Sequence, residues 1–369
     1  MKKTFCALFA VCMILTAGMT SCGEKNVTLE NPTGTYSQEF AGTTLNVFNW
    51  GEYISDGSEG SFDTNAAFEA LTGIKVNYMN FESNEAMYAK LKSGAVSYDI
   101  VIPSDYMIER LIKEDMVQKL DFSKLDNYKY IADEYRDLYF DPTNEYSVPY
   151  SVGMVGLIYN TALVEGTPDS WSIMWDEKYA DNILTFNNPR DAFAIAQFLL
   201  GIDINSTDHA AWDAAAAKLK EQNEVLQARV MDEVFNKMEG ENAAIAPYYA
   251  GDYLTMAENN PDLAFVYPKE GTNIFVDSIC IPKNAQNYEA ALMYINFMLE
   301  PEVALANAEY ICYASPNTAV VENPDYALYG NEYLYPAEDA KPKTQYFHDI
   351  DVETRSYYEK LWEDILLDD

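Results

Sequence analysis

Basic residues are scarce in this chain of 369 residues, where 24 Lys and Arg stand against 59 Asp and Glu for a formal net charge of −35. A chain this acidic repels the phosphates of nucleic acids and attracts cations. Most of these carboxylates must be solvated surface, and solubility alone would account for them. The charge balance therefore argues against a nucleic-acid partner and permits a cationic ligand without proving one.

Histidine is limited to His209 and His348, and neither lies in a metal-binding or nucleophile motif. No G-x-S-x-G, H-E-x-x-H, C-x-x-C, P-loop or G-x-G-x-x-G pattern is present. Carboxylates alone can hydrolyse glycosides, but a catalytic pair cannot be picked out among 59 acidic residues. We therefore expect no enzyme activity, no cofactor and no metal site, and keep an extracellular carbohydrate-active enzyme as an alternative.

Cysteine is also sparse. Once the N-terminal segment and Cys22 are set aside, only Cys280 and Cys312 remain, and two cysteines do not make a disulfide scaffold. Cys280 lies in the apolar run 279–282, which favours a buried thiol over a bridge. Whether the two cysteines pair is left open by the sequence.

Residues 1–21 combine a basic start, a short apolar core and small residues, which is the pattern of a secretory signal peptide. No second apolar run approaches the ~18 residues of a membrane span. The residues before Cys22 resemble a bacterial lipobox, in which that cysteine is lipidated; a plain cleavage site is the alternative. Residues 22–42 are then expected to form a flexible lipidated tether. This predicts an extracytoplasmic protein anchored to the cell membrane at the cell surface or the periplasmic face.

The ~325 residues that follow exceed what one core usually holds, which predicts two domains. Strands are expected at 44–53, 74–78 and 98–104, with helices at 68–71 before Gly73 and at 83–91 from an N-cap Ser83. This alternation is typical of an α/β domain with a largely parallel sheet. Because such sheets bind ligands at the carboxyl ends of their strands, residues 50–53 and 104–106 are expected to share one crevice.

The second half of the chain continues the alternation. Helices are expected near 191–200, 209–230 and 290–299, and strands near 182–186, 243–248, 263–268 and 274–281. The extended stretch 146–160 and the strand at 274–281 would carry the chain between two α/β lobes. For Trp171, Trp175 and Trp362, packing in the core or between the lobes is the better interpretation.

Binding chemistry is better supported than catalysis. The first strand runs directly into Trp50, Glu52 and Tyr53, which places aromatic faces beside a carboxylate. An alkylammonium ion needs carboxylates or carbonyls for its N–H groups and aromatic faces for its methylenes, and a cation–π contact contributes about 0.5–2 kcal/mol. The segments 248–252 and 275–277 offer the same combination. An organic cation is therefore the predicted ligand class.

The sequence resembles the spermidine/putrescine-binding proteins of polyamine ABC transporters. The matching segments follow in the same order over nearly all of the expected mature chain. Together they are specific for this family, whereas no single segment is. The resemblance is carried by residues 45–53, 73–76, 81–92, 98–104, 141–144, 146–150, 267–271, 277–278, 282–285 and 315–317.

The resemblance implies a type II periplasmic-binding-protein fold, with two α/β lobes joined by hinge crossings around a ligand cleft. Lobe 1 would comprise residues 43–148 and 275–313, and lobe 2 residues 149–274 and 314–369. The protein would be a monomer that captures a polyamine, putrescine or spermidine, and delivers it to the permease and ATPase subunits of an ABC importer. A polyamine sensor that signals without transport cannot be separated from this by sequence.

Carried over position by position, the resemblance assigns ligand contacts to Trp50, Glu52, Tyr53, Ser104, Tyr106, Asn188, Asp191, Tyr249, Asp252, Phe275, Asp277 and Tyr313. Asp277 would hold an inner amine and contribute most. Asn188 stands where spermidine binders carry an acid, which favours putrescine, whereas Glu52 resembles the spermidine branch, so the exact polyamine stays open. A ferric-ion binder of the same fold, with Tyr248 and Tyr249 as phenolate ligands, is the alternative.

Overall fold

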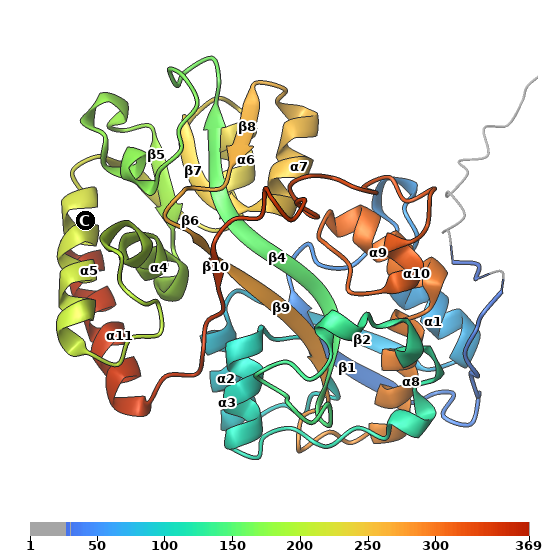
Figure 1. The fold of residues 1–369 in the computed structure, drawn as a ribbon. Coiled ribbons are helices and arrows are strands. Elements are labelled where there is room, and N and C mark those ends of the chain that lie inside the picture. The colour runs from blue at the N-terminus through green and yellow to red at the C-terminus, as the bar shows by residue number, and fades with distance from the viewer. Residues whose placement is uncertain (1–26, 30, 369) are drawn as a thin grey trace, which may run out of the picture.

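The computed structural model describes residues 27–29 and 31–368, and its first half has the predicted alternation of strands and helices (Figure 1). The elements follow in the order β1 (Thr44–Trp50), α1 (Thr64–Thr72), β2 (Lys75–Phe81), α2 (Asn84–Ser93), β3 (Ile100–Val101) and α3 (Asp105–Lys113). β1 lies between β2 and β3 and is parallel to both.

The predicted helix ends in this half are confirmed. Gly73 ends α1 with φ 72, and the Ser83 hydroxyl accepts a hydrogen bond from the Ala86 N–H at the start of α2. The strand predicted at 98–104 is shorter than expected, because only Ile100 and Val101 make ladder pairs with β1 before the chain turns into α3. The turn matters for the site, since it places Ser104 at the N-terminus of a helix.

Two long antiparallel strands, β4 (Ser147–Asn160) and β9 (Thr272–Cys280), run through the middle of the sheet. β9 pairs with β3 through Val101 and Cys280, while the other end of β4 pairs with β7 (Ile245–Tyr249) and β8 (Leu263–Val266). Figure 1 shows both strands passing from one half of the molecule to the other. The predicted crossings therefore exist as strands.

The second half contains β5 (Ile183–Phe186), β6 (Leu226–Val230), β7 and β8, with the helices α4 (Pro189–Leu200), α5 (His209–Gln222), α6 (Glu233–Glu239), α7 (Ala250–Asn259) and α11 (Val352–Leu367) around them. The helix predicted over 209–230 is wrong in its last third. α5 ends at Gln222, and β6 pairs in parallel with β5. Strand pairing has overridden the helix propensity of residues 226–229.

The remaining elements are α8 (Tyr288–Met298), α9 (Pro301–Ile311), α10 (Thr318–Val321) and β10 (Thr344–Gln345), which pairs with β9. The described strands form one ten-stranded mixed sheet, whose main path runs β2-β1-β3-β9-β4-β7-β5-β6. Short 3₁₀ turns fill the connections at Ser58–Gly60, Phe122–Lys124, Asp126–Tyr130, Asp133–Tyr135, Trp171–Trp175 and Glu177–Tyr179.

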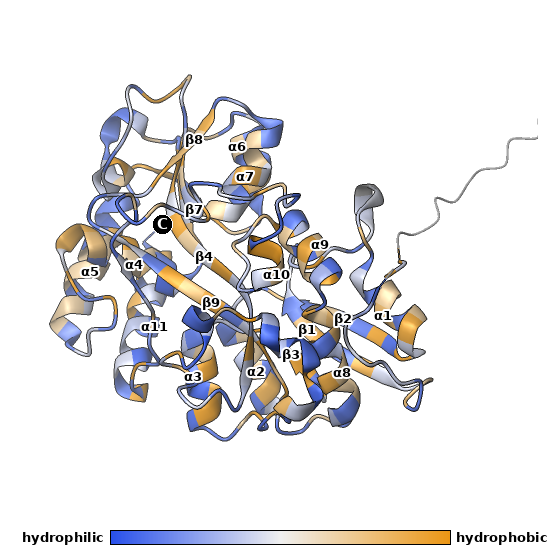
Figure 2. Cartoon of the chain, turned by 45° about the vertical axis from the view of Figure 1, so that its right-hand side comes forward, coloured by the Kyte–Doolittle hydropathy of each residue, from blue (hydrophilic) through white to orange (hydrophobic). Residues whose placement is uncertain are grey.

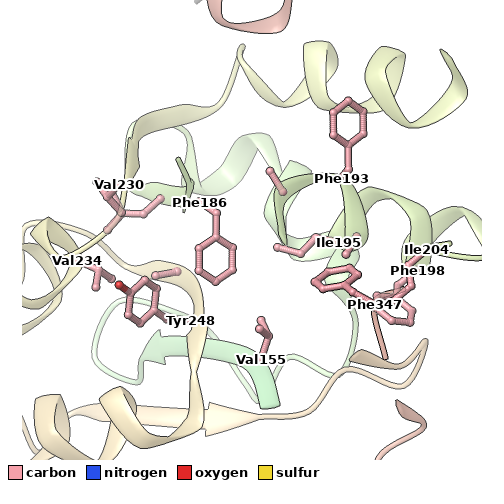
Figure 3. Close-up of a cluster of buried hydrophobic side chains, with 14 of the residues drawn as sticks. Val155, Phe186, Phe193, Ile195, Phe198, Ile204, Val230, Val234, Tyr248 and Phe347 are labelled. Atoms are coloured by element: carbon pink, nitrogen blue, oxygen red, sulfur yellow. The ribbon is translucent and has the colours of Figure 1, made fainter. Parts of the chain in front are cut away.

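Apolar residues line both faces of this sheet, and Figure 2 shows hydrophobic stretches along β4 and β9. Figure 3 shows part of the core of the second half, where the rings of Phe186 and Tyr248 stack with centroids 5.4 Å apart. The three tryptophans expected in the core all pack there: Trp171, Trp175 and Trp362. Cys280 is buried and Cys312 is partly buried, and both thiols are free, so the favoured interpretation of Cys280 is confirmed.

The segment expected to be a flexible tether is packed against the body over part of its length. Glu300, a buried carboxylate, accepts hydrogen bonds from the backbone N–H groups of Thr33 and Gly34 at 2.8 and 2.7 Å and from the Tyr36 hydroxyl at 2.5 Å. Tyr36 and Phe40 also pack against a hydrophobic cluster that includes residues of α8. The expectation of a free tether is therefore wrong for residues 33–40, because a buried carboxylate and apolar contacts hold it.

The predicted signal peptide at 1–21 and the predicted lipidation site Cys22 lie outside the described residues. Within the described residues, no helix combines the length and apolar character needed to cross a membrane.

Candidate ligand cavity

A cavity of about 540 Å³ opens where the ends of several elements converge. It is bounded by the end of β1 and the residues after it, by the first residues of α3, α4 and α7, by the middle of β9 and by Tyr313 after α9. All twelve residues assigned to ligand contacts line it: Trp50, Glu52, Tyr53, Ser104, Tyr106, Asn188, Asp191, Tyr249, Asp252, Phe275, Asp277 and Tyr313. Their convergence is observed, while their roles as ligand contacts stay predictions.

Asp277 lies on β9, lines the cavity and is 3% exposed. Its Oδ2 accepts a hydrogen bond of 2.7 Å from the Tyr53 hydroxyl, whereas its buried Oδ1 has no partner among the described residues. Burial raises the pKa of Asp277 to about 6, although the Tyr53 hydrogen bond and the nearby Ser104 side chain lower it. A buried acceptor without a donor is costly unless a ligand supplies one.

Asp191 and Asp252 repeat the same arrangement elsewhere in the lining of the cavity. The Tyr249 hydroxyl donates to Asp191 Oδ2 at 2.9 Å, and the Tyr313 hydroxyl donates to Asp252 Oδ2 at 2.9 Å. Burial raises the pKa of each carboxyl to about 7. Asp191 is 6% exposed, and Asp252 is half-buried. Three carboxyls are thus each oriented by a tyrosine.

Asn188 contributes to the site through Asp191. Its Oδ1 caps α4 by accepting from the Arg190 N–H at 3.1 Å, and its Nδ2 donates to Asp191 Oδ2 at 2.8 Å. In place of an acid, this residue therefore supplies a helix cap and a donor that fixes a neighbouring acid.

Aromatic rings enclose the space between the carboxyls. Tyr53 and Tyr313 meet edge to face at 5.5 Å, Tyr249 and Phe275 do so at 5.5 Å, and Phe275 and Tyr313 have centroids 6.3 Å apart. Trp50 packs against Phe81 with centroids 4.5 Å apart. Edge-to-face contacts of this kind hold the rings in fixed orientations.

Two glycines make room for these rings. A Cβ on Gly153 would lie 2.2 Å from the Phe275 ring, and a Cβ on Gly251 would lie 2.3 Å from the Tyr313 ring. Any larger residue at either position would displace a ring that lines the cavity.

The mouth of the cavity carries exposed carboxylates rather than buried ones. Glu52, in the left-handed conformation with φ 48, lies there with Glu82, Asp232 and Glu233. Tyr106 lines the wall near them and directs its hydroxyl to Glu85 Oε1 at 3.0 Å. The structure therefore separates Glu52 from the three inner carboxyls.

The cavity lining also includes residues that were not assigned as ligand contacts from the sequence, among them Asp105, Arg190 and Phe347. Asp105 and Arg190 are immediate neighbours of predicted residues, so their positions in the chain could have drawn attention to them. Phe347 lies in a C-terminal stretch without regular periodicity, and only the folded chain brings it to the cavity.

The phenolate alternative meets a specific obstacle. Tyr249 donates its hydroxyl proton to Asp191, and burial raises the pKa of Tyr249 well above its usual range. Within the described residues, no group of three or more His, Cys, Asp and Glu side chains could hold a metal ion. The geometry thus favours a hydrogen-bonding role for Tyr249.

Comparison with known proteins identifies the family of the chain. Residues 96–339 match the family described as bacterial extracellular solute-binding protein. The spermidine/putrescine-binding periplasmic protein of Salmonella typhimurium is 36% identical over 326 residues, which cover 86% of this chain and 91% of that protein. Its counterpart from Escherichia coli is 35% identical over the same shares of both chains.

A solved structure agrees with these sequence relatives. The spermidine/putrescine ABC transporter substrate-binding protein PotD of Streptococcus pneumoniae superposes with a TM-score of 0.73 at 34% identity, covering 88% of this chain and 99% of that one. The predicted mixed α/β solute-binding fold is therefore confirmed, and the matches are to solute-binding proteins rather than enzymes. By its sequence and its fold, the chain belongs to the family of bacterial extracellular solute-binding proteins.

Proposed function

We propose that this protein captures an aliphatic polyamine outside the cytoplasm and presents it to the permease of an ABC importer. The observation that carries the proposal is the set of three inner carboxyls, each oriented by a tyrosine hydroxyl, within a box of aromatic rings. Carboxylates bind ammonium groups, and aromatic faces cover the methylenes between them. The names of the Salmonella and Escherichia relatives support the same ligand class.

Asp277 is the proposed anchor for one ammonium group. Its unpartnered Oδ1 accepts the hydrogen bond, while Tyr53 holds Oδ2 and keeps the carboxylate in place. Asp191 and Asp252 receive the other end of the ligand. Removing one partner of a buried charge pair costs about 2–5 kcal/mol of binding free energy, so Asp277 is expected to be the largest single contributor.

We further propose that the two sides of the cavity belong to separate lobes, residues 43–148 with 275–313 and residues 149–274 with 314–369. Trp50, Tyr53 and Asp277 then come from lobe 1, and Asp191 and Tyr249 from lobe 2. β4 and β9 connect the lobes and act as the hinge. The ligand stabilises the closed form, because only that form lets both lobes contact it at once.

The proposed setting is a monomer tethered through a lipid on Cys22, which delivers its ligand to permease and ATPase subunits in the membrane. A basic, apolar and small-residue N-terminus followed by Cys22 supports the anchor. Metabolic labelling with a radioactive fatty acid, compared between wild type and Cys22→Ser, tests it.

The ligand assignment is tested by calorimetry with putrescine and spermidine on the purified mature protein. Wild type is expected to bind at least one of them, Asp277→Asn to bind about 30-fold or more weakly, and the exposed control Asp325→Asn to match wild type. Absence of heat with both amines refutes the proposal. A charge-transfer colour on adding ferric iron would favour the alternative ligand.

A further inference from the structure

One part of the cavity wall is held in place by side chains instead of a strand ladder. Residues 346–350 follow β10 without regular secondary structure, and Phe347 within them lines the cavity and is 4% exposed. The Phe347 ring meets the ring of Tyr106, which also lines the cavity, edge to face at 5.9 Å. Backbone groups in such a buried stretch need hydrogen-bond partners, and those partners fix the position of Phe347.

Asn205 provides two of these hydrogen bonds, one on each side of Phe347. Its Nδ2 donates to the Tyr346 carbonyl oxygen at 2.8 Å, and its Oδ1 accepts from the His348 N–H at 2.7 Å. Both distances are typical of well-formed hydrogen bonds. One amide side chain thus pairs with residues 346 and 348 as a neighbouring strand would.

The same side chain also holds Arg190. Asn205 Oδ1 accepts from a guanidinium nitrogen of Arg190 at 3.2 Å, and the guanidinium carbon lies 4.4 Å from the centroid of the Phe347 ring. Asn205 lies in the loop between α4 and α5 and is not among the residues that line the cavity. Any effect of Asn205 on a ligand therefore passes through the residues that it holds.

The segment has further attachments that do not depend on Asn205. The Tyr139 hydroxyl donates to the Phe347 carbonyl oxygen, and Glu109 Oε2 accepts from the Asp349 N–H at 2.8 Å. β10, which precedes the segment, pairs with β9. Removal of the Asn205 side chain should therefore loosen the wall around Phe347 without detaching the segment from the body.

We propose that Asn205 is a positioning residue of the ligand cavity, which keeps Phe347 fixed where the wall packs against the methylenes of an aliphatic amine. This rests on the proposed polyamine function. A wall residue that is already fixed loses little freedom when the ligand binds. A side chain that must first be immobilised weakens binding about two- to tenfold.

Calorimetry on the full mature protein tests the proposal through a double-mutant cycle, with whichever of putrescine and spermidine the wild type binds more tightly. Asn205→Ala is expected to weaken binding about three- to tenfold, and Phe347→Ala at least about threefold. In the Phe347→Ala background, Asn205→Ala should change the affinity by less than about twofold, because it acts through that residue.

The outcomes separate this proposal from the proposed function. An equally large loss in both backgrounds overturns the positioning role, and so does wild-type affinity in either single variant. Both results leave the polyamine function standing. A wild type that binds neither amine removes the function and the positioning role together.

Asn260→Ala is the matched control, because Asn260 makes the same pair of contacts and is not among the residues that line the cavity. Its Nδ2 donates to the Met238 carbonyl oxygen at 3.0 Å, and its Oδ1 accepts from the Asp262 N–H at 3.1 Å. This variant should lose stability and keep the wild-type affinity. An equal loss of affinity in Asn260→Ala would overturn a specific role for Asn205.

Hydrogen exchange on the wild type decides the question if Asn205→Ala does not fold. Ligand contact with Phe347 should stabilise the segment that carries it. Saturation with the amine should therefore slow exchange of the His348 amide at least about threefold more than that of the Asp262 amide. Equal slowing of both amides overturns the proposal.

Discussion

Binding of a polyamine should release protons, because the three inner carboxyls bind protons tightly when no ammonium is present. Burial raises the pKa of Asp277 to about 6 and those of Asp191 and Asp252 to about 7, from a usual value of 3.8. An ammonium beside each carboxylate favours the ionised form and lowers these pKa values again. The pH of the solution therefore decides how many protons the ligand displaces.

The number of released protons follows from these pKa values. Near pH 6 Asp277 is half protonated and the other two are mostly protonated, so binding should release about two protons. Near pH 8 all three are ionised, and the release should fall below about half a proton. By linkage, the logarithm of the association constant rises with pH with a slope of about two near pH 6 and flattens by pH 8.

Calorimetric titration in paired buffers of different ionisation enthalpy measures the proton count directly at each pH. Asp277→Asn removes one of the three titrating groups and should lower the count near pH 6 by about a half. An affinity that is flat between pH 5.5 and 8, or an uptake of protons on binding, would refute the proposed environment of the three carboxyls. Asp325→Asn serves as the control, since its exposed side chain should leave the count unchanged.

Two further substitutions test separate parts of the structure. Gly251→Ala places a Cβ 2.3 Å from the Tyr313 ring, so it should displace that ring from Asp252. Calorimetry should then show amine binding about tenfold or more weaker, while circular dichroism shows an unchanged fold. Wild-type affinity in this variant would contradict the reasoning. Glu300→Ala removes the acceptor for Thr33, Gly34 and Tyr36, so denaturant titration should show a loss of about 1–3 kcal/mol of stability. Amide exchange at Thr33 and Gly34 should become faster, and the affinity for amines should not change. Slow exchange at both amides in this variant would show that Glu300 does not hold the segment.

Much of the fold could be predicted because its signals are local. Gly73 and Ser83 mark helix ends, and alternating apolar residues mark β1 and β2. β6 was missed because its residues favour a helix by composition, and only pairing with β5 makes them a strand. The docking of residues 33–40 was missed for a related reason, since its partner Glu300 lies 264 residues beyond Tyr36.

In the candidate site, too, local features could be predicted from the sequence and long-range contacts could not. Residues at or just after the end of a strand, such as Trp50 and Tyr53, could be located from position alone. The pairing of Tyr53 with Asp277 and of Tyr313 with Asp252 could not, because each joins side chains far apart in the chain. Arg190 was overlooked because an arginine next to an acidic residue in the sequence is usually interpreted as part of an exposed ion pair. Its burial against Phe347 appears only in the folded chain.

A crystal structure of the mature protein grown with putrescine would test the central claim most directly. The account predicts an ammonium nitrogen about 2.7–2.9 Å from Asp277 Oδ1, with the methylene chain between the rings of Tyr249, Phe275 and Tyr313. Putrescine bound elsewhere, or a cavity in which Asp277 Oδ1 contacts only water, would contradict it.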